Sequence, residues 1–211
     1  MELHFFPGQN LLAIKQGNIY VSQYAAWGGP ASIGNDPRMP EEPTWPGTYV
    51  IHSTQTYITP TWAFSKIKWG TALQDKPQLN DVYYQLPNKK WASVKNDVGI
   101  ERKKIIDQYF TYYGKMKVPP TWVFNDFGPI AIRWFKDTNG NKILDKKETL
   151  SGQMFHTTPE NEAESSLGKS VNLVPSHGCI HLKPRDRDTI LNSGGFKPKT
   201  IFVVHNYNEK I

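Results

Sequence analysis

The stretch 172-NLVPSHGCIHL-182 places the one cysteine of the chain, Cys179, in a turn that leads into a short apolar run. Gly178 allows the backbone to turn tightly and leaves room for a substrate carbonyl beside the thiol. Backbone amides in such a turn can form an oxyanion hole. A lone cysteine is usually an inert buried side chain. These neighbours instead indicate a nucleophile, which needs a base or a positive field to lose its proton.

Three histidines are candidate bases for this thiol: His156, His177 and His181. His177 and Cys179 are two positions apart, so their side chains point to the same face of an extended chain. Residues this close within a tight turn rarely align for proton transfer, so we expect the base to come from a neighbouring strand. His156 ends an apolar strand and precedes two threonines, and from there it can reach a site at the strand ends.

Two patterns bear on metal binding. The cysteine and its surrounding histidines are zinc-ligand types, but the string H-x-C-x-H lacks the paired spacings of structural zinc sites. The stretch 137-DTNGNKILDKKE-148 carries oxygen ligands in an EF-hand-like order, yet Lys142 replaces the usual glycine and a strand precedes the stretch. A hairpin connection that turns at Asn139-Gly140 explains the pattern better. We therefore expect neither a metal nor a cofactor.

The composition favours a mainly β chain. Its 211 residues are 38% hydrophobic and 13% aromatic, which is enough for a core. Alternating and β-branched runs predict a hairpin over 10–26, followed by a loop rich in glycine and proline over 28–43. Further strands are expected at 44–53, 129–135, 149–158 and 200–205. A polar loop is expected at 159–171 and a short helix at 184–193.

Residues 54–126 have poor periodicity until 96–114, which reads as a helix ending at Gly114. Asn96 or Asp97 lies near its predicted start. The residues predicted to share its apolar face are Ile105, Ile106, Tyr109, Phe110 and Tyr113. We interpret 54–126 as an insertion of unassigned role within a single catalytic domain over 1–211.

The net charge of +6 is scattered along the chain. A basic surface suits several anionic partners, but we find no nucleic-acid-binding motif and expect no nucleic acid partner. No apolar stretch reaches the length of a membrane span. The N-terminus lacks the basic and apolar regions of a secretory signal.

Together these residues resemble the L,D-transpeptidase catalytic domain family (YkuD-type). The resemblance is carried by SHGC followed by an aliphatic residue, with a strand-end histidine upstream. The N-terminal hairpin, 44-TWPGTY-49, 127-FGP-129 and the last strand also occur in family order. The resemblance covers about 10–52 and 127–205, and it implies a curved β-sandwich with a few short helices.

Carried over by position, the resemblance implies that Cys179 is the acyl-accepting nucleophile and His156 its general base. His177 matches the second motif histidine, which shapes the pocket by hydrogen bonding. Ser176 and Gly178 match turn formers, and the amides around Gly178 and Cys179 match the oxyanion hole.

We predict that Ser176, His181 and Thr157 belong to the substrate-binding part of the site. In the family a backbone carbonyl orients the base, and Thr157 lies where that carbonyl would come from. His181 is a departure, because family members usually carry Arg or Asn there, and it bears on how the acyl substrate is held. The segment from the base to the motif is also long, and it contains 160-ENEAES-165, an acidic patch suited to an amine-bearing acceptor.

The resemblance implies an enzyme that acts on peptidoglycan tetrapeptide stems. The thiolate displaces the terminal D-alanine and leaves a thioester. A second stem's amine, a D-amino acid or water then accepts the acyl group, which gives L,D-transpeptidase or L,D-carboxypeptidase activity. Such an enzyme works in the periplasm or cell wall, which this chain would reach without a visible signal peptide.

Three alternatives stay open. A signal-less enzyme of this chemistry would suit an antibacterial effector whose partner is an immunity protein. A non-catalytic cell-wall-binding module with a vestigial turn predicts no covalent adduct. A sortase-like transpeptidase also uses His, Cys and Arg on a β framework, although its cysteine lies in a different local string.

Overall fold

The computed structural model describes residues 1–36 and 39–211. Pro37 and Arg38 belong to the predicted loop 28–43 and lie outside the described residues. The chain divides into two units, and the first comprises Met1–Gln55, Ala131–His156 and Val171–Ile211. The second comprises Thr56–Ile130 and Thr157–Ser170, so it holds most of the segment that we predicted as an insertion. That this segment is an insertion into one catalytic domain stays a prediction.

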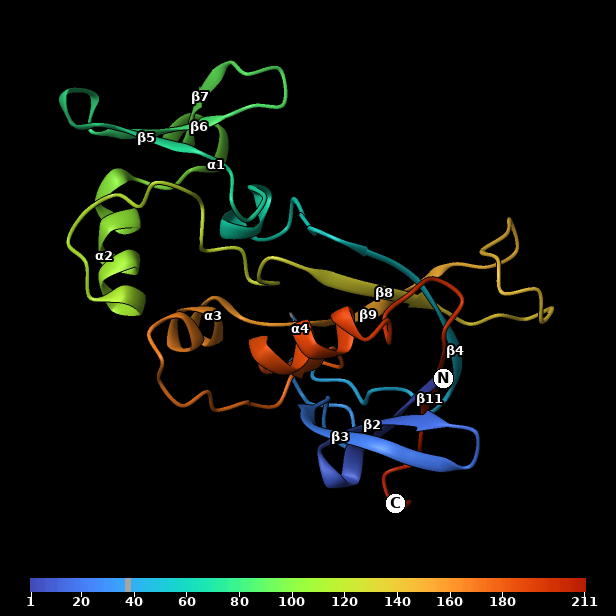
Figure 1. The fold of residues 1–211 in the computed structure, drawn as a ribbon. Helices are drawn as coiled ribbons and strands as arrows, with labels where there is room; N and C mark the ends of the chain where they lie inside the picture. The colour runs from blue at the N-terminus through green and yellow to red at the C-terminus, as the bar shows by residue number, and fades with distance from the viewer. Residues whose placement is uncertain (37–38) are drawn as a thin grey trace. The chain divides into compact units, whose positions relative to one another are not determined.

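The strands of the first unit close into a barrel in the order β1-β11-β4-β8-β9-β10-β3-β2. They are β1 (Glu2–Phe6), β2 (Leu11–Gln16), β3 (Ile19–Trp27), β4 (Gly47–Gln55), β8 (Ala131–Phe135), β9 (Leu150–His156), β10 (Ile180–Leu182) and β11 (Ile201–Val204). Helix α4 (Pro184–Asn192) lies between β10 and β11 in the chain (Figure 1). The predicted mainly β fold with a few short helices is confirmed, and its curved sheet closes on itself.

An aromatic cluster lies at the centre of this unit's core. The ring of Phe155 on β9 lies 5.0 Å from Trp134, 5.2 Å from Phe196 and 4.8 Å from Phe202, between ring centroids. Each of these four side chains is at most 1% exposed. Interlocked rings of this size bury much apolar area and fix the strands that carry them. β9, which ends at His156, is therefore held rigidly.

The predicted hairpin is confirmed, because β2 and β3 pair antiparallel on either side of Gly17, whose φ is +57°. The other predicted strands of the barrel and the helix at 184–193 form within a few residues of their expected bounds. β1 was not predicted. It pairs in parallel with β11, and a pairing between the two ends of a chain leaves no local signal in sequence.

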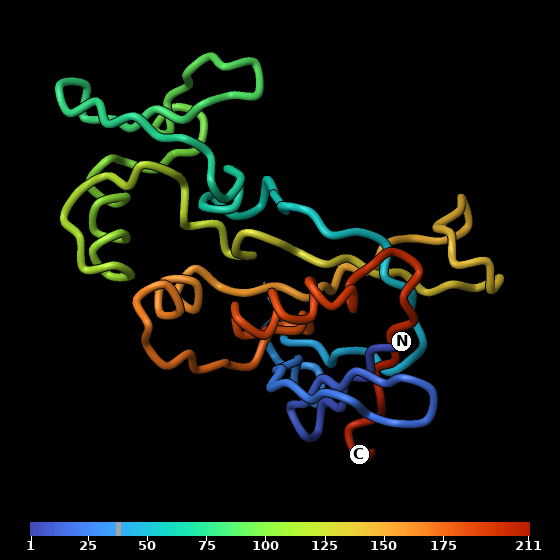
Figure 2. The backbone as a smooth tube through the Cα atoms, viewed as in Figure 1, coloured from blue at the N-terminus to red at the C-terminus, as the bar shows by residue number. Residues whose placement is uncertain are grey.

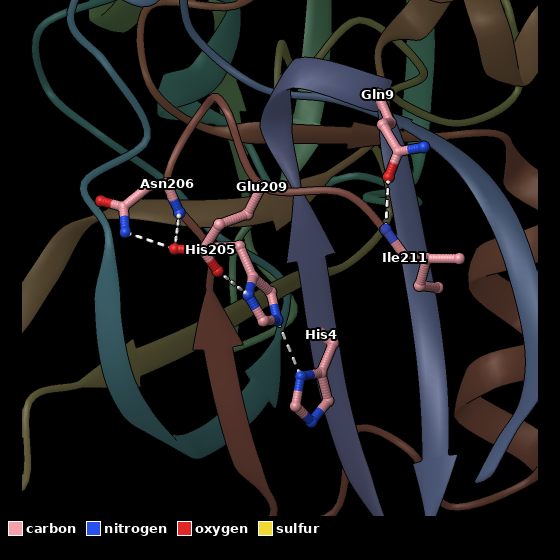
Figure 3. Close-up of polar contacts among 6 residues, drawn as sticks. All are labelled: His4, Gln9, His205, Asn206, Glu209 and Ile211. Atoms are coloured by element: carbon pink, nitrogen blue, oxygen red, sulfur yellow. Dashed lines mark hydrogen bonds and ion pairs between the residues drawn. The ribbon is translucent and has the colours of Figure 1, made fainter.

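Side chains join the two terminal strands and the last residues of the chain (Figure 3). His4 Nδ1 and His205 Nε2 are 2.9 Å apart, and His205 Nδ1 lies 2.7 Å from a carboxylate oxygen of Glu209. The Ile211 amide donates a 2.9 Å hydrogen bond to Gln9. These contacts tie the C-terminal residues to the barrel.

The stretch 137–148 connects β8 to β9, which pair antiparallel, so the predicted hairpin connection is confirmed. Figure 2 shows it as a loop that projects from the ends of these strands. Asp137 accepts hydrogen bonds from the amides of Gly140 and Lys142, both at 2.8 Å. Glu148, only 8% exposed, accepts from the Thr138 amide at 2.6 Å. The carboxylates of this loop therefore satisfy its own backbone.

The second unit contains a small antiparallel sheet in the order β5-β6-β7, three α-helices and two 3-10 helices. The strands are β5 (Leu73–Lys76), β6 (Asp81–Gln85) and β7 (Trp91–Ser93). The α-helices are α1 (Val94–Val98), α2 (Arg102–Tyr113) and α3 (Pro159–Ser166), and the 3-10 helices are η2 (Ala63–Lys66) and η3 (Pro77–Leu79). Its core is built from Ile67, Val82, Val94, Val98, Ile100, Ile105, Tyr109, Trp122 and Phe124. The segment with poor periodicity thus has a hydrophobic core of its own.

Two predictions for this unit were partly wrong. The helix predicted over 96–114 is two helices, because Gly99 at φ +79° ends α1 and α2 begins only at Arg102; the predicted end at Gly114 is confirmed. Phe110, predicted on the buried face, is 51% exposed. The loop predicted over 159–171 contains α3, which Thr158 caps by accepting from the Asn161 amide and Pro159 opens.

Candidate active site

A network of hydrogen bonds shapes the turn before Cys179. The Ser176 hydroxyl donates to the Cys179 carbonyl and accepts a 3.0 Å bond from the Gly178 amide. Gly178 has φ +111°, a conformation that favours glycine. A Cβ atom at this position would also overlap the Gln153 side chain. The backbone angle therefore favours glycine at this position, and a larger residue would also require the end of the Gln153 side chain to move.

Residues far apart in sequence support the same turn. The Thr44 hydroxyl donates to the Gly178 carbonyl at 2.9 Å and accepts from the Gly29 amide at 3.0 Å. The Tyr207 hydroxyl donates to the Gly29 carbonyl at 2.9 Å, and it accepts from the Thr44 amide at 3.0 Å. Sequence reasoning missed these supports. Thr44 opens the quoted string 44-TWPGTY-49, but Tyr207 lies outside every motif.

The strand register places the thiol and two of the candidate histidines on the same face of the sheet. β9 and β10 are parallel, with Phe155 beside Ile180 and His156 beside His181. Cys179 precedes Ile180, and its sulfur is hydrogen-bonded by the backbone of Met154. His156 lies two positions beyond Met154 on β9 and beside His181, which lies two positions beyond Cys179. Side chains alternate along a strand, so Cys179, His156 and His181 face the same side of this part of the sheet.

The three candidate histidines have different surroundings. His156 is 6% exposed, and its ring meets that of His181 edge to face at 4.7 Å between centroids. His181 is also buried, and its Nδ1 lies 3.0 Å from the Val174 carbonyl oxygen. His177 is exposed to solvent. Proton transfer needs a held geometry, and His156 has the packing for it.

Burial makes the Cys179 thiol a weaker acid than a free cysteine. Cys179 is half-buried. Burial raises the pKa of its thiol to about 11, and the Met154 hydrogen bond and the Arg133 charge oppose this effect only in part. A protonated thiol is a weak nucleophile. Attack on a carbonyl therefore requires that a base take the proton as the bond forms.

Other predicted site residues are already engaged. The Gly178 amide, predicted as an oxyanion donor, bonds Ser176. Thr157 is completely buried, and its hydroxyl donates to Glu162 within the second unit. In the predicted acidic patch, Glu160 accepts a 2.6 Å hydrogen bond from Tyr112.

Searches for a metal site and for a membrane span gave negative results. Within residues 1–36 and 39–211, no group of three or more His, Cys, Asp or Glu side chains is arranged to hold a metal ion. In the same ranges, no helix is both long and apolar enough to cross a bilayer.

Comparisons with known proteins gave one family match and one similar solved structure. A family model described as the L,D-transpeptidase catalytic domain matches residues 7–193. Among solved structures, the chain is similar to the L,D-transpeptidase (residues 123-326) from Xylanimonas cellulosilytica DSM 15894, at 9% identity and a TM-score of 0.41. That match covers 96% of this chain and 59% of the other. No curated protein matches the chain.

Proposed function

Because the chain belongs to the L,D-transpeptidase catalytic domain family, we propose that it forms a thioester on Cys179 with peptidoglycan tetrapeptide stems. The observation that supports the proposal is the parallel register of β9 and β10, in which Phe155 lies beside Ile180, the residue after Cys179, and His156 follows Phe155. Peptidoglycan lies outside the cytoplasm, so the proposal places the protein in the periplasm or cell wall.

In the proposed reaction, the Cys179 sulfur attacks the carbonyl carbon between the third residue of the stem and the terminal D-alanine. His156 takes the thiol proton as the carbon–sulfur bond forms. The carbon–nitrogen bond then breaks, and His156 returns the proton to the departing amine of D-alanine. A thioester remains on the enzyme. These steps use only side chains of this chain and the substrate.

A second nucleophile completes the cycle. The amine of another stem gives a crosslink, a free D-amino acid gives exchange, and water gives a shortened stem. In each case the incoming group attacks the thioester carbonyl, its proton passes through His156, and the Cys179 thiol is restored.

Intact mass spectrometry during incubation with tetrapeptide muropeptides tests the proposal. We expect an adduct whose mass equals that of the stem less D-alanine, together with free D-alanine in solution. The Cys179→Ala variant should give neither product. The matched control Ser193→Ala removes one hydroxyl at the end of α4 and should behave as the wild type.

Release of D-alanine by Cys179→Ala would show that another group performs the chemistry. A wild-type protein that binds muropeptides without any adduct or product would favour the non-catalytic cell-wall-binding module. Adding a D-amino acid and a second stem in separate reactions identifies the preferred acceptor from the product masses.

A further inference from the structure

Three adjacent strands of the barrel, β8, β9 and β10, carry a row of paired core residues. This row shows which face of the sheet points into the core. Ile132 on β8 pairs with Phe155 on β9, which pairs with Ile180 on β10. All three are 0% exposed. Side chains alternate between the two faces of a strand. The residue next to each member of this row therefore faces away from the aromatic core.

The neighbouring row contains Arg133, Met154 and Cys179. Arg133 pairs directly with Met154, and the Met154 backbone hydrogen-bonds the Cys179 sulfur. Arg133 and the thiol thus lie on one face of the sheet, separated by one strand. Adjacent strands are about 4.8 Å apart, so a charge on β8 lies close enough to act on the thiol.

A hydrogen bond to the backbone of β9 holds the Arg133 guanidinium group near the turn that leads into β10. Arg133 Nη2 donates a 2.9 Å hydrogen bond to the carbonyl of Ser151 on β9. Ser151 precedes Met154 on β9, and β10 runs parallel to β9. The guanidinium is therefore directed toward the side from which 176–179 approaches β10. Its charge acts on the thiol, lowering the pKa of Cys179 against the larger effect of burial.

We propose that Arg133 supplies, from β8, the fixed positive charge that stabilises the Cys179 thiolate as it forms. The proposal deepens the proposed function, since it assumes that Cys179 is the nucleophile. Arg133 acts as an electrostatic positioning residue and does not exchange a proton, because a guanidinium keeps its charge throughout the working pH range. His181, two residues after the cysteine, is an imidazole and does not carry the fixed positive charge that the guanidinium of Arg133 has.

The alkylation rate of the free protein by iodoacetamide tests the proposal without any cell-wall substrate. Cys179 is the one cysteine of the chain, so the modified mass reports a single thiol. Below the thiol pKa the rate follows the thiolate fraction, and a thiolate of higher pKa is somewhat more nucleophilic. We expect Arg133→Gln to alkylate about three- to tenfold more slowly than wild type across roughly pH 7 to 9.5.

Two further variants separate charge from structure. Arg133→Lys keeps the charge and should recover most of the lost rate. Arg185→Gln removes the same charge from an exposed position on α4, and it should leave the rate unchanged. Circular dichroism and thermal melting verify that each variant is folded. If Arg133→Gln fails to fold, Arg133→Lys and Arg133→Met carry the same comparison.

An unchanged alkylation profile in folded Arg133→Gln would overturn the proposal, and so would an equal loss in Arg133→Lys. The proposed function fails separately. If wild-type protein forms no adduct with muropeptides while Arg133→Gln still slows alkylation, the charge acts on the thiol but the assigned reaction is wrong.

Discussion

The Thr44 hydroxyl donates a 2.9 Å hydrogen bond to the carbonyl of Gly178, which joins the loop before β4 to the turn before Cys179. Thr44 is completely buried, and its oxygen also accepts from the Gly29 amide. A methyl group in place of this hydroxyl leaves a buried carbonyl and a half-buried amide without their partner. Such groups cost more than an ordinary lost contact.

Thr44→Val should therefore destabilise the protein by about 1–3 kcal/mol, since the side chains are similar in shape but valine makes no hydrogen bond. Thr44→Ser keeps the hydroxyl and should lose much less. Urea unfolding measures the stability, and D-alanine release measures whether the turn is still formed. Equal stability and activity in Thr44→Val and wild type would show that this contact does not support the turn.

His156→Ala should lower the rate of acylation of Cys179 by roughly 10²- to 10⁴-fold, the usual cost of losing a positioned general base. The burial-raised pKa of the thiol, about 11, makes this base necessary at neutral pH. His177 is exposed, so His177→Ala should have the smaller effect. Single-turnover mass spectrometry with a tetrapeptide stem compares the two variants. A larger loss in His177→Ala would exchange their roles.

The family and the candidate site could be predicted from the sequence because their signals are local. The string around Cys179 predicts a turn and a candidate nucleophile, and the short apolar run that ends at His156, with Met154 and Phe155, predicts a strand. The parallel pairing of β9 and β10 then brings the two together. Local patterns of this kind survive in a single sequence because neighbouring residues act on the same short element.

The supports of the site were not predictable in the same way. Tyr207 reaches Gly29 across most of the chain, and Arg133 faces Cys179 only because β8 and β9 have one particular register. Neither residue stands in a motif. Helix α3 is different, because Thr158 and Pro159 form a recognisable start signal that the surrounding polar composition obscured.

Glu148→Ala should destabilise the 137–148 connection by about 1–3 kcal/mol, because the buried carboxylate accepts the Thr138 amide. Asp137→Ala should loosen the same loop by releasing the amides of Gly140 and Lys142. We expect no rise in melting temperature with micromolar calcium, since the Lys142 side chain adds a positive charge to the loop. A rise of several degrees that Asp137→Ala removes would make the loop a metal site.

The contacts between the terminal strands should make stability depend on pH. Burial lowers the pKa of His4, and the nearby charges of His205 and Lys15 act in the same direction, against hydrogen bonding to Glu2. The other titratable groups in contact with His4 and His205 are Tyr20, beside His4, and Glu209, beside His205. A histidine whose folded pKa lies below its unfolded value binds its proton more weakly in the native state. Its contribution to stability is complete above about pH 6.5 and is lost as the pH falls through the folded pKa.

The melting temperature should therefore fall between pH 7.5 and 5.5, and His4→Gln should flatten this dependence. Glu209, whose pKa is lowered by its hydrogen bonds to His205 and Asn206, adds a further loss only at more acidic pH. Gln9→Ala is the matched control, because it breaks the terminal contact with Ile211 without removing a titratable group (Figure 3). It should lower the melting temperature equally at both pH values. A His4→Gln variant that keeps the full wild-type dependence would place the responsible proton elsewhere.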